Sequence, residues 1–281
     1  MKKILIASIG IAVSVLFINA KMNNNFPEKI DFAGEEAPLN IPDVKERMDR
    51  ELVVNEFMHG STILIMKRAN KAFPVIEPIL AKYNVPDDFK YLAVIESSLT
   101  NAVSSAGARG VWQFMPQTAK EKGLEVSETV DERYHLVKST EAACRYLIAA
   151  KEKFGSWTMA AASYNGGING LQAQIDFQGV NNYYDLLLNE ETSRYVFRIL
   201  ALKEIMKNPA KYNFVIPQEE LYKKQITRKI LIDSSVSNLA EFSKLQGINY
   251  KVLKYHNPWL RDKKLDNPTK KIYEIEIPEV K

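Results

Sequence analysis

Apolar residues recur at helical spacing through most of the chain. Near the start of this region, Val44, Met48 and Leu52 fall on one face of a 3.6-residue period. Similar patterns predict helices over 43–57, 62–83, 86–96, 116–122, 139–154, 157–164 and 190–206, with loops over 97–112 and 165–182. Strand patterns are nearly absent in this part of the chain. Residues 43–208 therefore predict an almost all-α domain.

The pattern changes toward the C-terminus, where two stretches predict strands, the second with clean alternation of apolar and polar residues. Two short helical patterns lie between the two strands. These four elements cover 225–232, 237–246, 250–256 and 271–277. Their order predicts a small α+β module of βααβ type over residues 225–281. Residues 209–224, which contain Pro209 and Pro217, predict a linker between the two parts.

The N-terminus has the layout of a secretory signal peptide. Lys2 and Lys3 precede an apolar run of 15 residues, and the small residue Ala20 follows at a suitable cleavage point. A spanning helix normally needs ~20 residues, so cleavage of residues 1–20 is favoured over a retained anchor. Residues 21–42 are polar and carry three prolines, which predicts a flexible spacer. We expect export to the periplasm or cell envelope, and leave peripheral membrane association open.

Charge and cysteine usage exclude several classes of function. Residues 1–20 hold two lysines, so the rest of the chain has 36 basic and 34 acidic residues. This near balance does not indicate nucleic-acid binding, which needs a basic face or stripe. Cys144 is the only cysteine, and the three histidines lack metal-ligand spacing. We expect no metal, no cofactor and no disulfide framework, and the oligomeric state stays open.

Glu96 is the candidate catalytic residue. It follows an apolar run from Phe89 to Ile95, and burial of a carboxyl group in such a setting raises its pKa. A carboxyl group that is still protonated near neutral pH can act as a general acid. The next acidic residue is Glu121, so no second carboxylate is close in sequence. This pattern predicts cleavage of a sugar polymer by a single acid; an exposed or ion-paired glutamate is the structural alternative.

Four ordered signatures, spread over about 100 residues, resemble those of the lytic transglycosylases, lysozyme-like enzymes that cut bacterial peptidoglycan. They are Glu96-Ser97, residues 110–116 (Gly-Val-Trp-Gln-Phe-Met-Pro), residues 162–167 (Ala-Ser-Tyr-Asn-Gly-Gly) and residues 191–196 (Glu-Thr-Ser-Arg-Tyr-Val). Each signature alone is weak, but their order and spacing together are specific. The overall layout is similar to the membrane-bound lytic murein transglycosylase D group. The resemblance implies a lysozyme-like fold for residues 43–208.

The resemblance also implies roles for individual residues. Glu96 matches the catalytic acid and base, and Tyr164 with Asn165 matches a pair that faces its carboxyl group. The positions that match substrate-binding residues are Ser97, Ser105, Gln113, Met115, Tyr164, Asn165, Glu191 and Tyr195. Structural alternatives are a loop cap for Gln113, core packing for Met115 and Tyr164, and support of Tyr195 or Arg194 for Glu191. The chain departs from the common family pattern at Trp112, Phe114 and Ser163, which puts the detailed shape of the glycan cleft in question.

The reaction implied by the resemblance needs no water. Glu96 protonates the glycosidic oxygen between MurNAc and GlcNAc, and the N-acetyl oxygen of the substrate stabilises the positive charge. Glu96 then takes the proton of the MurNAc 6-hydroxyl, which closes a 1,6-anhydro ring. Most glycosidases use two carboxylates instead. Two alternatives remain: a goose-type-lysozyme-like hydrolase, which would leave a reducing end, and a non-catalytic glycan-binding protein.

The C-terminal module resembles a LysM domain, a small βααβ fold that binds N-acetylglucosamine polymers. The resemblance lies in residues 238–243 and 253–260, where Asn257-Pro258 stands at a position that LysM repeats often share. It implies peptidoglycan glycan strands as the partner of this module. The alternative is a purely structural extension that packs on the catalytic domain.

Overall fold

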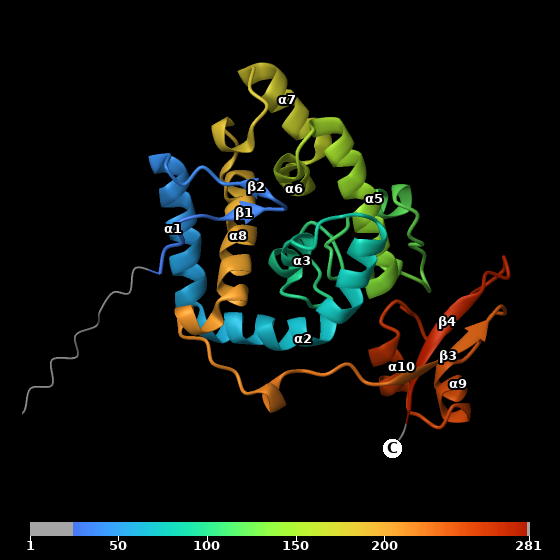
Figure 1. Cartoon of the computed structure of the whole chain (residues 1–281). Coiled ribbons are helices and arrows are strands. Elements are labelled where there is room, and N and C mark those ends of the chain that lie inside the picture. The colour runs from blue at the N-terminus through green and yellow to red at the C-terminus, as the bar shows by residue number, and fades with distance from the viewer. Residues whose placement is uncertain (1–24, 280–281) are drawn as a thin grey trace, which may run out of the picture.

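The computed structural model describes residues 25–279, which form a mainly helical domain followed by a small α+β module (Figure 1). The helices of the main domain are α1 (Pro42–Phe57), α2 (His59–Lys82), α3 (Phe89–Ser97), α4 (Pro116–Glu121), α5 (Leu136–Phe154), α6 (Trp157–Gly166), α7 (Ile168–Gln178) and α8 (Glu190–Lys207). The fold class predicted from the sequence is confirmed. The predicted signal peptide over 1–20 lies outside the described residues. None of the helices within 25–279 is long and apolar enough to cross a membrane.

α3 is the buried centre of the main domain. Leu92 and Ala93 are fully buried, and so is Phe89 at the start of the helix. Figure 1 shows α3 surrounded by α2, α5, α6 and α8, and α8 packs against α1, α3 and α6. A helix that is buried on most of its faces, as α3 is, is stable only in such an enclosed position. The enclosure places the last turn of α3, and with it Glu96, inside the domain.

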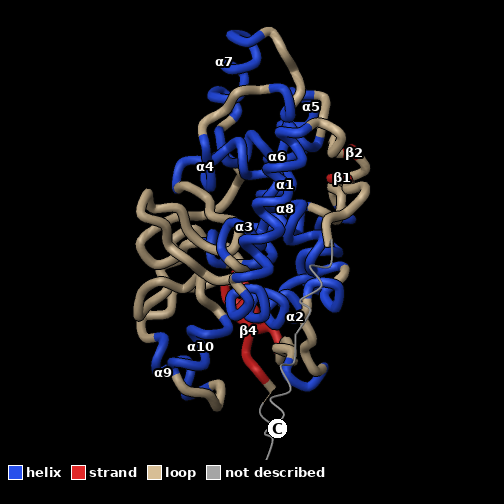
Figure 2. The backbone as a smooth tube through the Cα atoms, turned by 90° about the vertical axis from the view of Figure 1, so that its left-hand side faces the viewer, coloured by secondary structure: helices blue, strands red, loops and turns tan. Residues whose placement is uncertain are grey.

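The main difference from the predicted elements is α7, which lies where the sequence predicted a loop over 165–182. Leu171 is the buried residue of this helix, so its apolar stripe is too narrow to give a strong helical pattern. The helix is followed by Gly179, whose φ of 70° is typical of a left-handed C-cap. Figure 2 shows α7 at the opposite end of the molecule from the C-terminal module.

Residues 25–41 differ from the predicted flexible spacer, because apolar side chains anchor them to the main domain. β1 (Asp31–Phe32) and β2 (Glu35–Glu36) form an antiparallel hairpin. Phe32 is fully buried and meets Phe89 of α3 edge to face, with 4.9 Å between ring centroids. The burial of Phe32 makes the hairpin part of the domain core.

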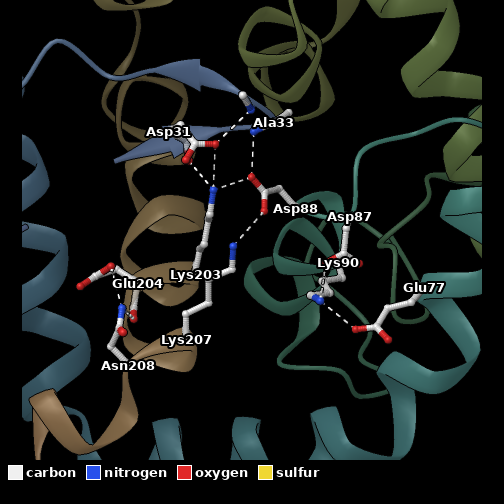
Figure 3. A network of polar contacts seen from close by, with 11 residues as sticks. Asp31, Ala33, Glu77, Asp87, Asp88, Lys90, Lys203, Glu204, Lys207 and Asn208 are labelled. Carbon is white, nitrogen blue, oxygen red and sulfur yellow. Dashed lines mark hydrogen bonds and ion pairs between the residues drawn. The ribbon is translucent and has the colours of Figure 1, made fainter. Parts of the chain in front are cut away.

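A buried lysine fixes the same hairpin (Figure 3). Nζ of Lys203, from α8, lies 3.1 Å from Oδ1 of Asp31 and 2.6 Å from Oδ2 of Asp88. The backbone N–H of Ala33 donates to the same Asp88 oxygen at 2.8 Å. Since an unpaired buried charge is costly, these contacts hold the hairpin, the start of α3 and α8 in one arrangement.

The C-terminal module has the predicted βααβ order. Its elements are β3 (Thr227–Ile232), α9 (Leu239–Leu245), α10 (Tyr250–His256) and β4 (Tyr273–Pro278). β3 and β4 pair antiparallel, with Ile230 opposite Ile275. Side chains of Asn238 and Asn249 accept backbone N–H bonds at the starts of α9 and α10. Leu239, Leu253 and Ile275 are fully buried between the sheet and the helices.

The segment predicted as a linker, 209–224, also packs on the main domain. Tyr212 and Phe214 are buried in its core. Further along, the backbone of Tyr222 accepts a 3.0 Å hydrogen bond from Asn70 Nδ2 and donates one of 3.3 Å to the Lys67 carbonyl. The segment therefore follows α2 through specific contacts on its way to the module.

Candidate active site

Glu96 lies in the last turn of α3, which ends where Ser98 takes a left-handed conformation with φ of 51°. The preceding residues Leu92 to Ile95 are all buried, while the Glu96 side chain keeps part of its surface accessible. Burial raises the pKa of the Glu96 carboxyl group to about 7. A protonated but accessible acid is what proton donation to a leaving group requires.

Three residues of α8 set the electrostatic surroundings of Glu96. The Tyr195 hydroxyl donates a hydrogen bond to Oε1 of Glu96, which lowers the pKa of the carboxyl group. The positive charge of Arg198 lowers that pKa further, and the negative charge of Glu191 raises it. Glu191, Tyr195 and Arg198 are spaced by four and three residues, so they share one face of α8. Burial has the largest effect, and the pKa therefore stays raised.

Ser97 faces away from this group of residues, although it follows Glu96 directly. Its side chain is 8% exposed, and its hydroxyl donates to the Val111 carbonyl at 2.8 Å. The resemblance implied a substrate-binding role for Ser97, and in the structure the Ser97 hydroxyl has a partner within the protein. A step of about 100° per helical residue separates the two side chains. Ser97 instead ties the end of α3 to the loop that follows it.

The loop after α3 contains three of the predicted substrate-binding residues. Gln113 has a φ of 49°, and its Nε2 donates to the carbonyls of Ala102 at 3.1 Å and Gly110 at 2.8 Å. The amide group of Gln113 thus links two carbonyl groups of the loop. Met115 is 42% exposed and Ser105 is exposed, so both side chains face solvent.

Tyr164 and Asn165, at the end of α6, both form hydrogen bonds within the protein. The Tyr164 hydroxyl donates to the Trp112 carbonyl at 2.8 Å, and its ring packs against Phe114. Tyr195, and not Tyr164, donates to the carboxyl group of Glu96. The Tyr164 hydroxyl instead satisfies the carbonyl of Trp112, a fully buried residue whose carbonyl needs a hydrogen-bond donor. Burial also raises the pKa of Tyr164 well above its usual value, with a further increase from the nearby charge of Glu96.

Asn165 links the end of α6 to the start of α8. Its Nδ2 donates to Oε1 of Glu191 at 3.1 Å, and its Oδ1 accepts from the Thr192 hydroxyl at 2.8 Å. The structure therefore brings Asn165, Glu191 and Tyr195 together on the side of Glu96 that α8 covers. Arg194 points elsewhere, because its Nε donates to the buried carboxylate of Glu51 at 2.7 Å.

Arg198 is the functional candidate that sequence reasoning missed. It lies two residues beyond the last signature, so no motif includes it. Its Nη2 donates to the Ile95 carbonyl at 3.3 Å, which keeps the guanidinium beside the end of α3. The sequence spacing could have indicated it, because a residue three positions after Tyr195 on a helix lies on the same face as Tyr195.

Comparisons with known proteins find two family matches in this chain. Residues 74–186 match the family described as the transglycosylase SLT domain, and residues 228–281 match the soluble lytic transglycosylase C-terminal LysM-like domain. Two similar relatives are both named membrane-bound lytic murein transglycosylase D, from Escherichia coli strain K12 and from the O6:H1 strain CFT073. Each is 28% identical over 235 residues, which is 80% of this chain and 50% of the relative.

The resemblance to lytic transglycosylases is thereby confirmed, as is that of the C-terminal module to LysM-like domains. The chain spans about half the length of the curated relatives that it matches. The matched SLT region contains Glu96, the loop 97–115 and Tyr164, whereas Tyr195 and Arg198 lie beyond its end.

Proposed function

We propose that this protein is a peptidoglycan lytic transglycosylase in which Glu96 acts first as acid and then as base. The observation that carries the proposal is the state of Glu96: a partly accessible carboxyl group whose pKa burial raises to about 7. At neutral pH about half of such groups are protonated, and a group poised near the working pH can both give and take a proton. The family matches and the names of the relatives support the choice of substrate.

The proposed reaction has two steps. The Glu96 proton moves to the glycosidic oxygen between MurNAc and GlcNAc, the C1–O bond breaks, and the GlcNAc hydroxyl leaves. The acetamido oxygen of MurNAc stabilises the charge at C1. The Glu96 carboxylate then removes the proton of the MurNAc 6-hydroxyl, whose oxygen bonds to C1 as the 1,6-anhydro ring closes. Glu96 ends protonated, as it began, and no water is consumed.

Four residues around Glu96 support this cycle. The Tyr195 hydroxyl holds one carboxyl oxygen of Glu96, so that the other oxygen is left for the proton transfers. Arg198 supplies positive charge when the carboxylate forms, and Glu191 limits how far the pKa falls. Asn165 holds Glu191 at the edge of the site. This arrangement favours a carboxyl group that changes its protonation state twice in each turnover.

The proposal includes where the protein acts and how its module contributes. Export by residues 1–20 would bring the enzyme to the cell envelope, where peptidoglycan is found. The C-terminal module would contact glycan strands, as the LysM-like family match suggests. Glycan strands are thus the proposed partner of both parts of the chain.

Clearing of purified peptidoglycan sacculi tests the activity. The wild-type protein should lower the turbidity of the suspension, and Glu96→Gln should retain below about 1% of that rate, because an amide is isosteric but neither gives nor takes the proton. Glu152→Gln, an exposed change on α5, is the matched control and should clear at the wild-type rate. Clearing by folded Glu96→Gln at more than a few per cent of the wild-type rate would refute the assignment of Glu96.

A further inference from the structure

Residues 125–135 lie between the main domain and the C-terminal module and form part of both. The backbone N–H of Asp131 donates to the Trp259 carbonyl at 2.9 Å, and the N–H of Arg261 donates to the Thr129 carbonyl at 2.8 Å. Val130 is fully buried in the core of the module. The module therefore completes its own core with a segment of the main domain.

Polar contacts strengthen the same junction. Nζ of Lys271, beside β4, lies 2.6 Å from Oε2 of Glu125 and 2.9 Å from Oε1 of Glu132. The Tyr273 hydroxyl donates to Glu125 at 2.9 Å. The Glu132 side chain is 3% exposed. Burial raises the pKa of its carboxyl group, but hydrogen bonds from Lys138, Lys271 and the backbone of Glu125 lower this pKa by more. The module thus supplies one cation, Lys271, and the Tyr273 hydroxyl to two acidic residues of the main domain, of which Glu132 is buried and would be costly to leave with fewer partners.

Arg133 connects this junction to the loop of the candidate active site. Its side chain is 3% exposed and forms a two-fold pair with Asp131, through Nε at 2.9 Å and Nη2 at 2.7 Å. Nη1 of Arg133 donates to the carbonyls of Gly107 at 3.2 Å and Phe114 at 3.1 Å. One guanidinium group therefore joins both ends of the loop 107–114 to the segment 125–135, on which the C-terminal module packs.

The backbone of Arg133 also contacts this loop. A Cβ atom at Gly110 would lie 1.9 Å from the Arg133 carbonyl oxygen, so only glycine fits there, and the φ of 81° at Gly110 favours glycine as well. The loop in turn presents the Trp112 carbonyl to Tyr164 and the Val111 carbonyl to Ser97, the residue next to Glu96. A shift of Arg133 would be transmitted directly to the surroundings of Glu96.

We propose that Arg133 is a positioning residue for the active site, and that docking of the C-terminal module on residues 125–135 sets its position. The proposal rests on the proposed function and adds to it: the module contributes to the rate of cleavage, besides any contact with glycan. A module that only bound glycan would change the binding of insoluble peptidoglycan and leave the turnover of short soluble fragments unchanged.

Steady-state kinetics on a short soluble peptidoglycan glycan fragment test the proposal in the full-length chain. Arg133→Lys keeps the charge but loses the two-fold pair, so kcat should fall about 10- to 100-fold with KM changed less than about threefold. The module variant Lys271→Ala with Tyr273→Phe should lower kcat about 3- to 10-fold, since the junction loosens at a distance from the site. Lys229→Ala, which removes an exposed ion pair with Glu274 within the module, is the control and should keep the wild-type kcat.

Hydrogen exchange of residues 107–114 gives a second readout that needs no activity. The N–H groups of Arg109 and Gly110 are held by backbone hydrogen bonds of 3.1 and 3.0 Å, and they should exchange about tenfold faster in both variants. Unchanged loop exchange together with an unchanged kcat in a folded Lys271→Ala, Tyr273→Phe protein would overturn the proposal. If the wild-type protein cleaves no peptidoglycan, the proposed function fails, while the exchange measurement still tests the link between the module and the loop.

Discussion

The hydroxyl group of Tyr195 donates a hydrogen bond to the carboxyl group of Glu96, although the two residues are 99 positions apart in the chain. Tyr195 lies on α8 and is 2% exposed, and Glu96 lies in the last turn of α3. The packing of α8 on α3 thus sets the geometry of the candidate acid. Two opposing effects meet there: burial raises the pKa of Glu96, and the bond from Tyr195 lowers it.

Tyr195→Phe should therefore shift the pH dependence as well as the rate. Without the hydroxyl donor the pKa of Glu96 rises, so the high-pH limb of kcat/KM, which reports loss of the protonated acid, should move above its position near pH 7. The rate should fall about 10- to 100-fold, because the carboxyl group loses its fixed orientation. A pH–rate profile of the purified variant measures both effects. A limb that stays in place or moves to lower pH would contradict this account.

Arg198 and Glu191 should move the same limb in opposite directions. Arg198→Gln removes a positive charge that lowers the pKa of Glu96, so the limb should move up by about 0.5 to 1 pH unit. Glu191→Gln removes a negative charge that raises this pKa, so the limb should move down by a similar amount. Because the two variants control for each other, shifts in the same direction would show that these charges do not act on Glu96.

Tyr164→Phe should affect stability more than the family resemblance alone suggests. Its hydroxyl satisfies the buried Trp112 carbonyl, and an unsatisfied buried acceptor costs about 1 to 2 kcal/mol. We expect a lower free energy of unfolding in denaturant melts, together with a reduced kcat from displacement of the loop 107–114. The high-pH limb should stay close to its wild-type position, which distinguishes Tyr164 from Tyr195. Wild-type stability with a shifted limb would assign Tyr164 to the carboxyl group after all.

Glu96→Gln should stabilise the fold, but only at high pH. The pKa of Glu96 is about 7 in the folded protein against an ordinary value of 4.5, so the folded state resists ionisation of this group. Below pH 4.5 the group is protonated in both states and costs nothing. As pH rises toward 7 the cost grows, to at most about 3 kcal/mol at pH 8. Denaturant melts at pH 4 and pH 8 should show a gain for Glu96→Gln at pH 8 alone, and no gain for Glu152→Gln. Equal stability of Glu96→Gln and wild type at pH 8 would mean that the carboxyl group is not buried.

Features that depend on neighbouring residues in the chain were predictable from the sequence. The apolar run before Glu96 predicted its raised pKa, and strand patterns predicted β3 and β4 to within two residues at each end. Contacts between distant segments were not predictable in this way. The orientation of Ser97 depends on where the loop carbonyl of Val111 lies, and the hairpin of residues 31–36 depends on Lys203 from the far end of the main domain.

The roles of Tyr164 and Tyr195 show the same limit. Their signatures indicated that both belong to one site, but which hydroxyl reaches Glu96 depends on the packing of α6 and α8. Arg198 carries no motif, and only the three-dimensional position of α8 relates it to Glu96. α7 was missed because its apolar stripe is narrow.

The most direct test of the central claim is the chemistry of the released sugar ends. Purified peptidoglycan is digested by the wild-type protein in water enriched in heavy oxygen, and the soluble products are analysed by mass spectrometry. The account predicts MurNAc ends that are one water lighter than reducing ends, carry a 1,6-anhydro ring and contain no label, because the 6-hydroxyl of the substrate attacks C1. Labelled reducing ends would contradict it and would identify the protein as a hydrolase.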